Sequence, residues 1–449
     1  MNLPRLDAPG KAFAEAPRFR GDFFSCLDAH RDELFELTDA LLCADGRVMT
    51  PVDLTLLPEH RRGHGALYAA LNDGRIDIAR LRRVLAALPQ PKAADHRLVL
   101  AVDVSNWLRP DAECSPDRLF CHTFGRGRDQ HLMIPGWPYS FVAALESGRT
   151  SWCQLLDAVR LGPEDDAAEV TAAQVRRVVL DLIAGGQWHQ GDAEIVVVFD
   201  AGYDAPRLAH LLDGLPVEVL GRLRSDRVMR KPLPRPWSCP PQGGRPPKHG
   251  KEFRFAKPET WGGPDAATVQ VTDRYGTAQA MAWDRIRPRL TTRSAWIDHD
   301  GVPLIEGTLI RLEVDHLPGG AEPLPVWLWS SGTGMTGADV DLHWQAFLRR
   351  FNLEHTFRMI KQTLGWTRRK LRTPEAADRW TWLIVTAHTQ LRLARPRAHL
   401  PCPARAPKPN RPGPGRPLGS KNHQPATRYD VGKTVRRPET IIERDQIRQ

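Results

Sequence analysis

Four side chains in the segment FLRRFNLEHTFRMIK, residues 347–361, combine residue types that could do chemistry. Phe347 is followed at offsets of three, seven and fourteen residues by Arg350, Glu354 and Lys361. At about 3.6 residues per turn, a helix would align these four side chains along one face. A guanidinium, a carboxylate and an ammonium on one face make a poor core, but they suit a site that handles both a metal ion and a phosphate.

Two aspartates stand on apolar strands where a carboxylate needs a partner. Asp103 interrupts the run LVLAVDVSNW, and Asp200 ends the apolar part of AEIVVVFDAGYD. Burying a lone carboxylate is costly unless it is paired, hydrogen-bonded or bound to a metal. Together with Glu354, these aspartates could converge at the carboxyl edge of an α/β sheet, where such folds place their sites. Oxygen ligands without a nearby His or Cys cluster predict Mg²⁺ or Mn²⁺, and a pair of such ions is the apparatus of phosphoryl transfer.

The elements that must position these residues follow from changes in the sequence pattern. Residues 1–95 predict a helical N-terminal domain with a break between two helices at Asn72-Asp73-Gly74. Such a domain could be a helix-turn-helix DNA reader, or it could be a helical cap on the domain that follows. Alternating apolar strands and amphipathic helices over residues 96–230 then predict an α/β catalytic core.

The second half of the chain changes character twice. Residues 231–335 are rich in Pro and Gly with short β-like segments, and they predict a β-rich insertion. Helical periodicity returns over residues 336–395, which predicts the C-terminal helices of the core. Residues 396–449 are Pro-rich and basic and predict a disordered tail. Within the core, the segment RLFCHTFGRGRDQHLMIPGWPYSFVAAL predicts two strands around Gly125-Arg126-Gly127, followed by a helix.

Composition limits the class of protein. The 449 residues suit two or three domains, and 41% hydrophobic residues with 14 Trp and 14 Phe can build a substantial core. The formal net charge is +10, and residues 396–449 carry twelve Lys or Arg against four Asp or Glu, so that a polyanionic partner is expected. Seven scattered cysteines without a CxxC pair argue against a disulfide framework or a zinc ribbon. Because neither a signal core nor an apolar run long enough to span a bilayer occurs, we expect a cytoplasmic, nucleoid-associated protein and no membrane partner.

The pattern F-(2)-R-(3)-E-(6)-K resembles the Y-(2)-R-(3)-E-(6)-K signature of a branch of bacterial insertion-sequence DDE transposases. The blocks LAVDVSN and VVVFDAGYD resemble the first and second aspartate blocks of that family, and the gaps of 97 residues from Asp103 to Asp200 and 154 from Asp200 to Glu354 resemble its architecture. The resemblance implies an RNase H-like mixed sheet flanked by helices and interrupted by a β-rich insertion. It further implies an Asp103–Asp200–Glu354 triad that holds two Mg²⁺ ions, with Mn²⁺ as an alternative.

The same resemblance implies partners and DNA contacts. Double-stranded DNA, namely the element's terminal inverted repeats and its target, would be bound by a homodimer in a synaptic complex, with Arg350 and Lys361 on phosphate. Phe347 replaces the signature tyrosine, so it could pack or stack but could not donate a hydrogen bond. From the residues themselves, Arg222 on the strand VEVLGRLRSD could also contact DNA. Arg416 lies in a Gly-Arg-Pro tripeptide that resembles an AT-hook core.

Each acidic residue also has a plainer interpretation. Asp103 could cap a nearby amide, Asp200 could be a strand-end turn residue, and Glu354 with Arg350 could form a solvated ion pair. Their joint occurrence, in this order and at the signature spacing, favours the catalytic interpretation. We therefore expect a transposase that cleaves element ends and joins the 3′-hydroxyl to target DNA. The alternatives are a noncatalytic DNA-binding protein derived from such an enzyme and an RNase H-like nuclease that only hydrolyses.

Overall fold

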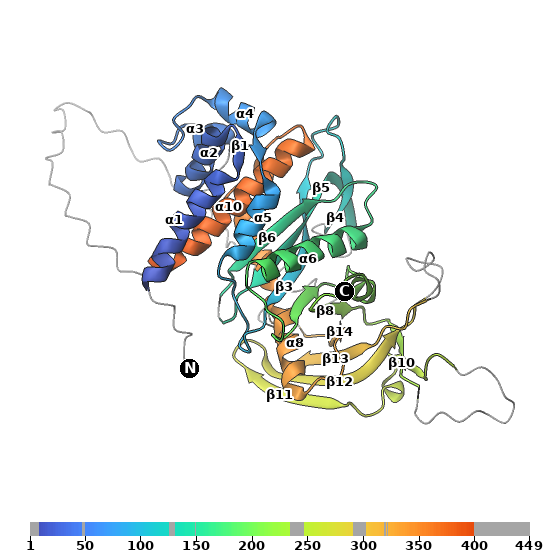
Figure 1. Cartoon of the computed structure of the whole chain (residues 1–449). Coiled ribbons are helices and arrows are strands. Elements are labelled where there is room, and N and C mark those ends of the chain that lie inside the picture. The colour runs from blue at the N-terminus through green and yellow to red at the C-terminus, as the bar shows by residue number, and fades with distance from the viewer. Residues whose placement is uncertain are drawn as a thin grey trace, which may run out of the picture.

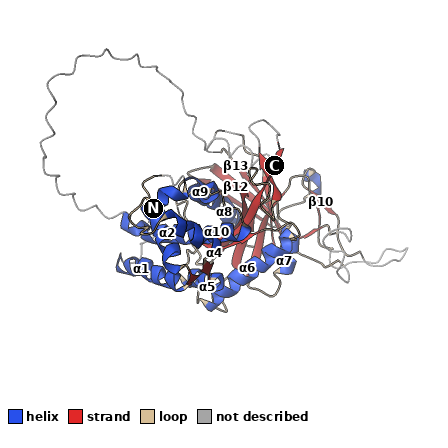
Figure 2. Ribbon diagram, turned by 90° about the horizontal axis from the view of Figure 1, so that it is seen from above, coloured by secondary structure: helices blue, strands red, loops and turns tan. Residues whose placement is uncertain are grey.

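A mixed β-sheet runs through the molecule, with helices on both of its faces (Figures 1 and 2). The computed structural model describes residues 9–46, 50–124, 131–148, 150–233, 247–290, 302–317, 320 and 322–398. Within these ranges twelve strands form this one sheet, and two further short strands pair separately. The predicted fold class, a mixed α/β sheet flanked by helices, is confirmed. Arg416 and nearly all of the predicted tail lie outside the described residues.

The centre of the sheet carries the strands predicted for the core. Strand β3 is parallel to β7, β7 is parallel to β8, and β5 is antiparallel to β3. Apolar side chains cover both faces of these strands, and all five residues of β7 are buried. The bounds are Val99–Leu108 for β3, His131–Leu145 for β5, Ile195–Phe199 for β7 and Val217–Leu223 for β8.

The helix predicted after Gly125-Arg126-Gly127 is wrong, because β5 continues as one strand to Leu145. Tyr139 and Phe141 pack into the hydrophobic core on one face of the sheet, whereas Val142 and Ala144 pack into the core on the other. A strand buried on both faces has a continuous apolar sequence, which resembles a buried helix. Its outer edge pairs first with β4, Leu119–Phe124, and then with β6, Cys153–Arg160.

The predicted β-rich segment after residue 230 extends the same sheet. Strand β14 pairs antiparallel with β8, and β13 and β12 follow in order. The added strands pack through aromatic side chains, including Phe255 stacked on Trp327 at 4.2 Å between ring centroids. The bounds are Val228–Arg230 for β9, Glu252–Arg254 for β10, Ala266–Thr272 for β11, Gly276–Pro288 for β12, Gly307–Val314 for β13 and Val326–Ser330 for β14; the 3₁₀ turn η1 spans Pro258–Thr260.

Helices α6, Ala167–Ala184, and α7, Ala205–Leu211, cover one face of the sheet. The other face carries α8, Gly337–Arg349, α9, Phe351–Gln362, the turn η2, Trp366–Arg368, and α10, Pro374–Ala398. The single helix expected over residues 347–361 is interrupted at Arg350. There the backbone bonds are of the shorter i→i−3 type, from Arg350 N–H to Phe347 O and from Leu353 N–H to Arg350 O.

The N-terminal helices pack directly on α10, and Figure 1 shows α1 running alongside it. Phe19 and Phe23 of α1 are fully buried and belong to the same hydrophobic core as α10. The break predicted at Asn72-Asp73-Gly74 lies between α4 and α5, as expected. The bounds are Pro9–Ser25 for α1, Arg31–Cys43 for α2, Pro51–Thr55 for α3, His64–Asp73 for α4 and Ile78–Ala87 for α5; Leu27–Ala29 (β1) pairs with Arg75–Ile76 (β2). None of the described helices is long and apolar enough to cross a membrane.

Candidate active site

Two neighbouring parallel strands and one helix bring the three predicted carboxylates together. The ladder between β3 and β7 pairs Ala101 with Val198, and continuing that register sets Asp103 level with Asp200. Asp200 directly follows the last residue of β7, at the carboxyl edge of the sheet. Glu354 lies in the first turn of α9.

The side chain of Arg350 joins all three carboxylates. Its Nη1 donates to Asp103 Oδ2 at 2.9 Å, and its Nη2 lies 3.4 Å from Asp200 Oδ2 and 3.5 Å from Glu354 Oε1. The structure therefore brings together the three acidic residues that the sequence singled out. In place of the plainer alternative, a solvated pair of Glu354 and Arg350, it shows a four-residue cluster.

The cluster has a buried cationic centre and a partly open acidic rim. The side chains of Asp103, Asp200 and Glu354 are 20%, 29% and 21% exposed, whereas that of Arg350 is 1% exposed. Asp103 Oδ1 accepts a hydrogen bond from the Val104 amide, but Asp200 Oδ1 is buried with no hydrogen-bond partner. Solvent or a ligand can therefore reach the carboxylates from the rim.

The crowding of negative charge shifts the pKa of Asp103. Burial raises this pKa to about 6, the Arg350 guanidinium opposes the rise, and the neighbouring charges of Glu354 and Asp200 add to it. For Arg350, burial lowers the pKa, but the three carboxylates outweigh burial and the net direction is upward. The guanidinium therefore stays charged at any relevant pH.

The predicted DNA contacts are less accessible than expected. Phe347 is 2% exposed and packs in the core, with its ring centroid 5.9 Å from Arg350 Cζ, so neither residue faces a phosphate in this conformation. Arg222 is 9% exposed, and its pKa is lowered by burial against the opposing charge of Asp200. Lys361 is partly buried beside Asp103, and burial lowers its pKa to about 8. Arg350 and Arg222 place positive charge near the three carboxylates, because buried carboxylates need compensating cations.

The sequence interpretation missed Tyr203. Its hydroxyl is buried close to Asp103 and Arg350, and burial, followed by the charge of Asp103, raises its pKa. The ring lies 5.2 Å from that of Phe199, and its backbone N–H donates to Asp200 O at 3.2 Å. The tight spacing of DAGY was the available signal, because a turn directly after Asp200 folds Tyr203 back onto the same edge.

The carboxylates fit a hard divalent cation in chemistry. As the side chains lie, no group of three or more His, Cys, Asp or Glu within the described ranges is arranged to hold a metal ion. However, three carboxylates already converge on one cationic group, and Asp200 Oδ1 is a buried oxygen without a donor. Asp103, Asp200 and Glu354 are therefore the residues that would hold a divalent ion such as Mg²⁺ or Mn²⁺. The Arg350 guanidinium now lies where that ion would bind.

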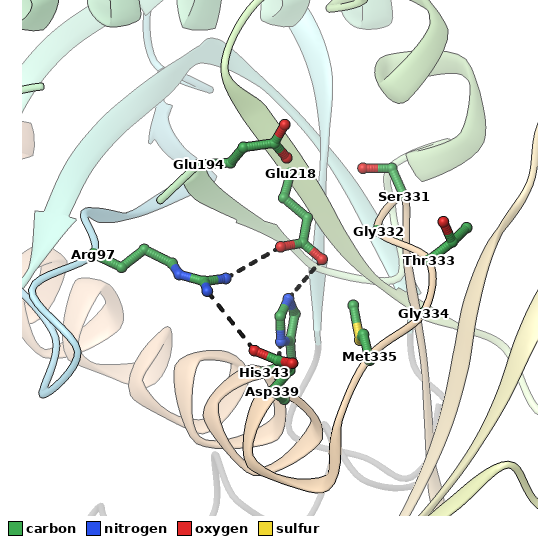
Figure 3. Close-up of a pocket in the computed structure, with 10 residues that line it drawn as sticks. All are labelled: Arg97, Glu194, Glu218, Ser331, Gly332, Thr333, Gly334, Met335, Asp339 and His343. Atoms are coloured by element: carbon green, nitrogen blue, oxygen red, sulfur yellow. Dashed lines mark hydrogen bonds and ion pairs between the residues drawn. The ribbon is translucent and has the colours of Figure 1, made fainter. Parts of the chain in front are cut away.

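A second polar site lies at the opposite edge of the sheet (Figure 3). It is a pocket of about 440 Å³ near the starts of β7 and β8 and the N-terminus of α8. Glu218 is central to it, because its carboxylate lies 2.8 Å from His343 Nε2 and 3.3 Å from Arg97 Nη1 and accepts a hydrogen bond from Ser330 Oγ at 2.6 Å. The lining residues are Arg97, Glu194, Glu218, Ser331, Gly332, Thr333, Gly334, Met335, Asp339 and His343. This network ties β8 to α8, the helix that leads into α9 and Glu354.

A mixed α/β sheet that brings Asp103, Asp200 and Glu354 together beside the carboxyl end of β7 defines an α/β protein with a candidate site for a divalent cation. Residues 22–289 match the family model described as DDE superfamily endonuclease, and the chain belongs to this family. The predicted membership among DDE proteins is thus confirmed, whereas the signature branch and bacterial origin stay predictions. DDE-type endonuclease domains use divalent metals. The match includes Asp103 and Asp200 and ends before Glu354; no curated protein matches the chain.

Proposed function

We propose that this DDE endonuclease is a transposase that cleaves the ends of a mobile element and joins the new 3′-hydroxyl to target DNA. The convergence of Asp103, Asp200 and Glu354 on Arg350 carries the proposal, because it joins Glu354, which lies beyond the family match, to two aspartates that lie within the matched residues. Its partners would be double-stranded DNA, as terminal inverted repeats and as target, and a second copy of the chain in a synaptic complex. Its location would be the nucleoid.

The roles of the residues follow from their positions. Asp103, Asp200 and Glu354 would hold two divalent ions, which when bound would activate the attacking oxygen and stabilise the leaving one. Lys361 lies beside Asp103 and would attract the phosphate entering the rim. Cleavage and joining are both in-line displacements at phosphorus, so one set of carboxylates would serve both.

Replacing Glu354 with Gln tests the site. We expect cleavage of the DNA that flanks the gene to fall by at least about 100-fold, because the amide loses the charge that a metal ligand needs. DNA binding, measured by a mobility shift, should persist. The matched control is Glu375→Gln, which makes the same change at an exposed position in the first turn of α10. Cleavage by the Glu354→Gln variant at the rate of the control would show that the site is wrongly assigned.

An oligonucleotide with a free 3′-hydroxyl separates the proposed reaction from the alternatives. The transposase proposal predicts a covalent joined product between this oligonucleotide and a second duplex in the presence of Mg²⁺ or Mn²⁺. Cleavage without joining would identify a nuclease that only hydrolyses. Binding of the duplex with neither reaction would identify a noncatalytic DNA-binding protein.

A further inference from the structure

Arg350 occupies the point on which the three carboxylates converge. We propose that Arg350 is a positioning residue that holds the place of a divalent cation in the metal-free protein and is displaced when an ion binds. This inference rests on the proposed function of the same site. It assigns to Arg350 a role in assembling Asp103, Asp200 and Glu354 before the ion arrives.

The contacts of Arg350 with the carboxylates are long enough for a metal ion to replace the guanidinium. Only its bond to Asp103, at 2.9 Å, is short; the approaches to Asp200 and Glu354 are 3.4 and 3.5 Å, and its Nε is buried without a hydrogen-bond partner. A charged donor and acceptor in an optimised pair lie about 2.7–2.9 Å apart. Arg350 therefore bridges the three carboxylates through one close contact and two longer ones.

A structural ion cluster elsewhere in the same chain shows the contrast. The carboxylate of Asp157 is fully buried, and it accepts hydrogen bonds from Arg82 Nε at 2.8 Å and from Arg177 Nη2 at 2.6 Å. There, two arginines saturate one carboxylate. At Arg350, one guanidinium is shared among three carboxylates.

The charge balance favours replacement of the guanidinium by an ion. Three carboxylates close together repel one another, and the one guanidinium among them, with Arg222 and Lys361 acting from the surroundings, offsets only part of that repulsion. A divalent ion at the same point would carry twice the charge and accept the carboxylate oxygens as direct ligands. The rim of the cluster is 20–29% exposed, so an ion can enter without passing the buried guanidinium.

Two aromatic rings from neighbouring residues flank the Arg350 guanidinium. Arg350 is the single residue between α8 and α9, and the rings of Phe347 and Phe351 lie 5.9 and 5.3 Å from its Cζ. Rings of this kind hold a guanidinium by cation–π attraction without fixing its hydrogen bonds. Once displaced, the guanidinium is free to pair with a DNA phosphate at the rim, which reconciles its burial here with the DNA contact expected from the sequence.

Binding of Mn²⁺ to the full chain without DNA tests the proposal. We expect Arg350→Gln to bind Mn²⁺ at least about tenfold more tightly than the unmodified protein by calorimetry, because no cation has to be displaced. The metal-free variant should melt at a lower temperature, and Mn²⁺ should raise its melting temperature by more than that of the unmodified protein. Arg369→Gln is the matched control, because Arg369 is also 1% exposed but lies over Trp380, at 4.7 Å from its ring, away from the carboxylates. It should keep the original Mn²⁺ affinity.

A purely structural Arg350 predicts the opposite pattern. In that case Arg350→Gln would be destabilised equally with and without Mn²⁺, and its Mn²⁺ affinity would be unchanged, weaker or absent; any of these results overturns the proposal. If the Gln variant does not fold, Arg350→Lys decides, because a shorter side chain with one cationic nitrogen reaches fewer carboxylates. Tighter Mn²⁺ binding by the Lys variant supports the placeholder role, and equal or weaker binding overturns it.

The two proposals for this site fail in different experiments. Unchanged Mn²⁺ affinity in Arg350→Gln, together with loss of cleavage in Glu354→Gln, would reject the placeholder role and keep the proposed function. Tighter Mn²⁺ binding in Arg350→Gln, with cleavage surviving in Glu354→Gln, would keep the placeholder role and reject the catalytic assignment.

Discussion

At the scale of single residues, the ionised side chain of Asp103 lowers the stability of the folded protein. Its carboxylate is held in an apolar strand, where burial and two neighbouring carboxylates disfavour the ionised form. Arg350 offsets only part of this cost, since the net direction of the pKa is upward. The ionised form is nevertheless the one that a metal ligand requires. The strand therefore carries a charge that the proposed metal binding requires and that lowers the stability of the metal-free protein.

This cost predicts that Asp103→Asn stabilises the metal-free protein at neutral pH. Because the folded-state pKa of Asp103 is raised from 3.8 to about 6, stability of the unmodified protein falls as pH rises through that interval. We expect the variant to gain on the order of 1–2 kcal/mol in unfolding free energy at pH 7, less than the full shift implies because the side chain is 20% exposed. The gain should vanish below about pH 4. Urea unfolding at both pH values, with chelator present, measures it; a variant that is less stable at pH 7 would contradict the argument.

The sequence identified the three acidic residues of the site, but it did not predict what surrounds them. Asp103 and Asp200 stand out because a carboxylate is unusual in an apolar strand, and Glu354 stands out by its spacing from Arg350 and Lys361. The burial of Arg350 could not be predicted, because helical periodicity places it on a face without saying what covers that face. Tyr203 was missed because the turn after Asp200, which the sequence does indicate, does not by itself show that the Tyr203 side chain folds back onto the carboxylates.

At the scale of elements, the network around Glu218 fixes α8 against β8. His343 Nδ1 lies 2.6 Å from the Asp339 carbonyl oxygen, which can only accept, so Nδ1 carries the proton. Its Nε2 then faces the Glu218 carboxylate at 2.8 Å. Burial alone would raise the pKa of Glu218, but the hydrogen bond and charge of His343 outweigh it and the net direction is downward. The pair thus stabilises the start of the helical segment that carries Glu354.

Replacing Glu218 with Gln should release this attachment. We expect a loss of about 2–4 kcal/mol in unfolding free energy at pH 7, because buried His343 and Ser330 lose the carboxylate that they contact. Since the folded-state pKa of Glu218 lies below its ordinary value of 4.5, the pair's contribution is present above that value and is lost as pH falls through the folded-state pKa. The difference between the variant and the unmodified protein should therefore shrink on acidification. Glu194→Gln, an exposed carboxylate of the same pocket, is the control and should change stability little; equal losses in the two variants would refute the role of the pair.

Helices and strands with a clear sequence pattern were predicted correctly, whereas a strand buried on both faces was not. Apolar runs correctly indicated the strand that contains Asp103 and the strand before Asp200. The two glycines after α6, beginning with Gly185, correctly indicated the end of that helix. Strand β5 was assigned partly to a helix because its neighbours bury both of its faces, which removes the alternation that identifies a strand. The break at Arg350 was also missed, because residues 347–353 contain no Gly or Pro that would mark it.

At the scale of the whole molecule, the N-terminal helices and α10 form one body. Every residue from 381 to 390 in α10 is buried, so the helix is covered by the sheet on one side and by α1 and its neighbours on another (Figure 1). Arg20 of α1 donates to Gln390 Oε1 at 2.9 Å, and Arg379 of α10 donates to the carbonyl of Leu71 in α4. The family match begins within α1, at residue 22, and so includes most of these helices. These contacts favour the helical cap over a separate DNA-reading domain, although the boundary at residue 95 stays a prediction.

A chain that begins at residue 96 should therefore fail to fold as the full chain does. Removing the cap would expose the apolar surface of a helix that is buried on all sides, including Trp380 and Leu383, each 0% exposed. We expect aggregation, or loss of the cooperative thermal transition and of near-ultraviolet circular dichroism. Removal of residues 399–449 is the control: it leaves all described residues in place and should move the melting temperature by no more than about 2 °C, while weakening DNA binding and its salt dependence through loss of basic residues. A soluble 96–449 chain that unfolds cooperatively near the temperature of the full chain would restore the independent DNA-reading domain, because the core would then need no cap.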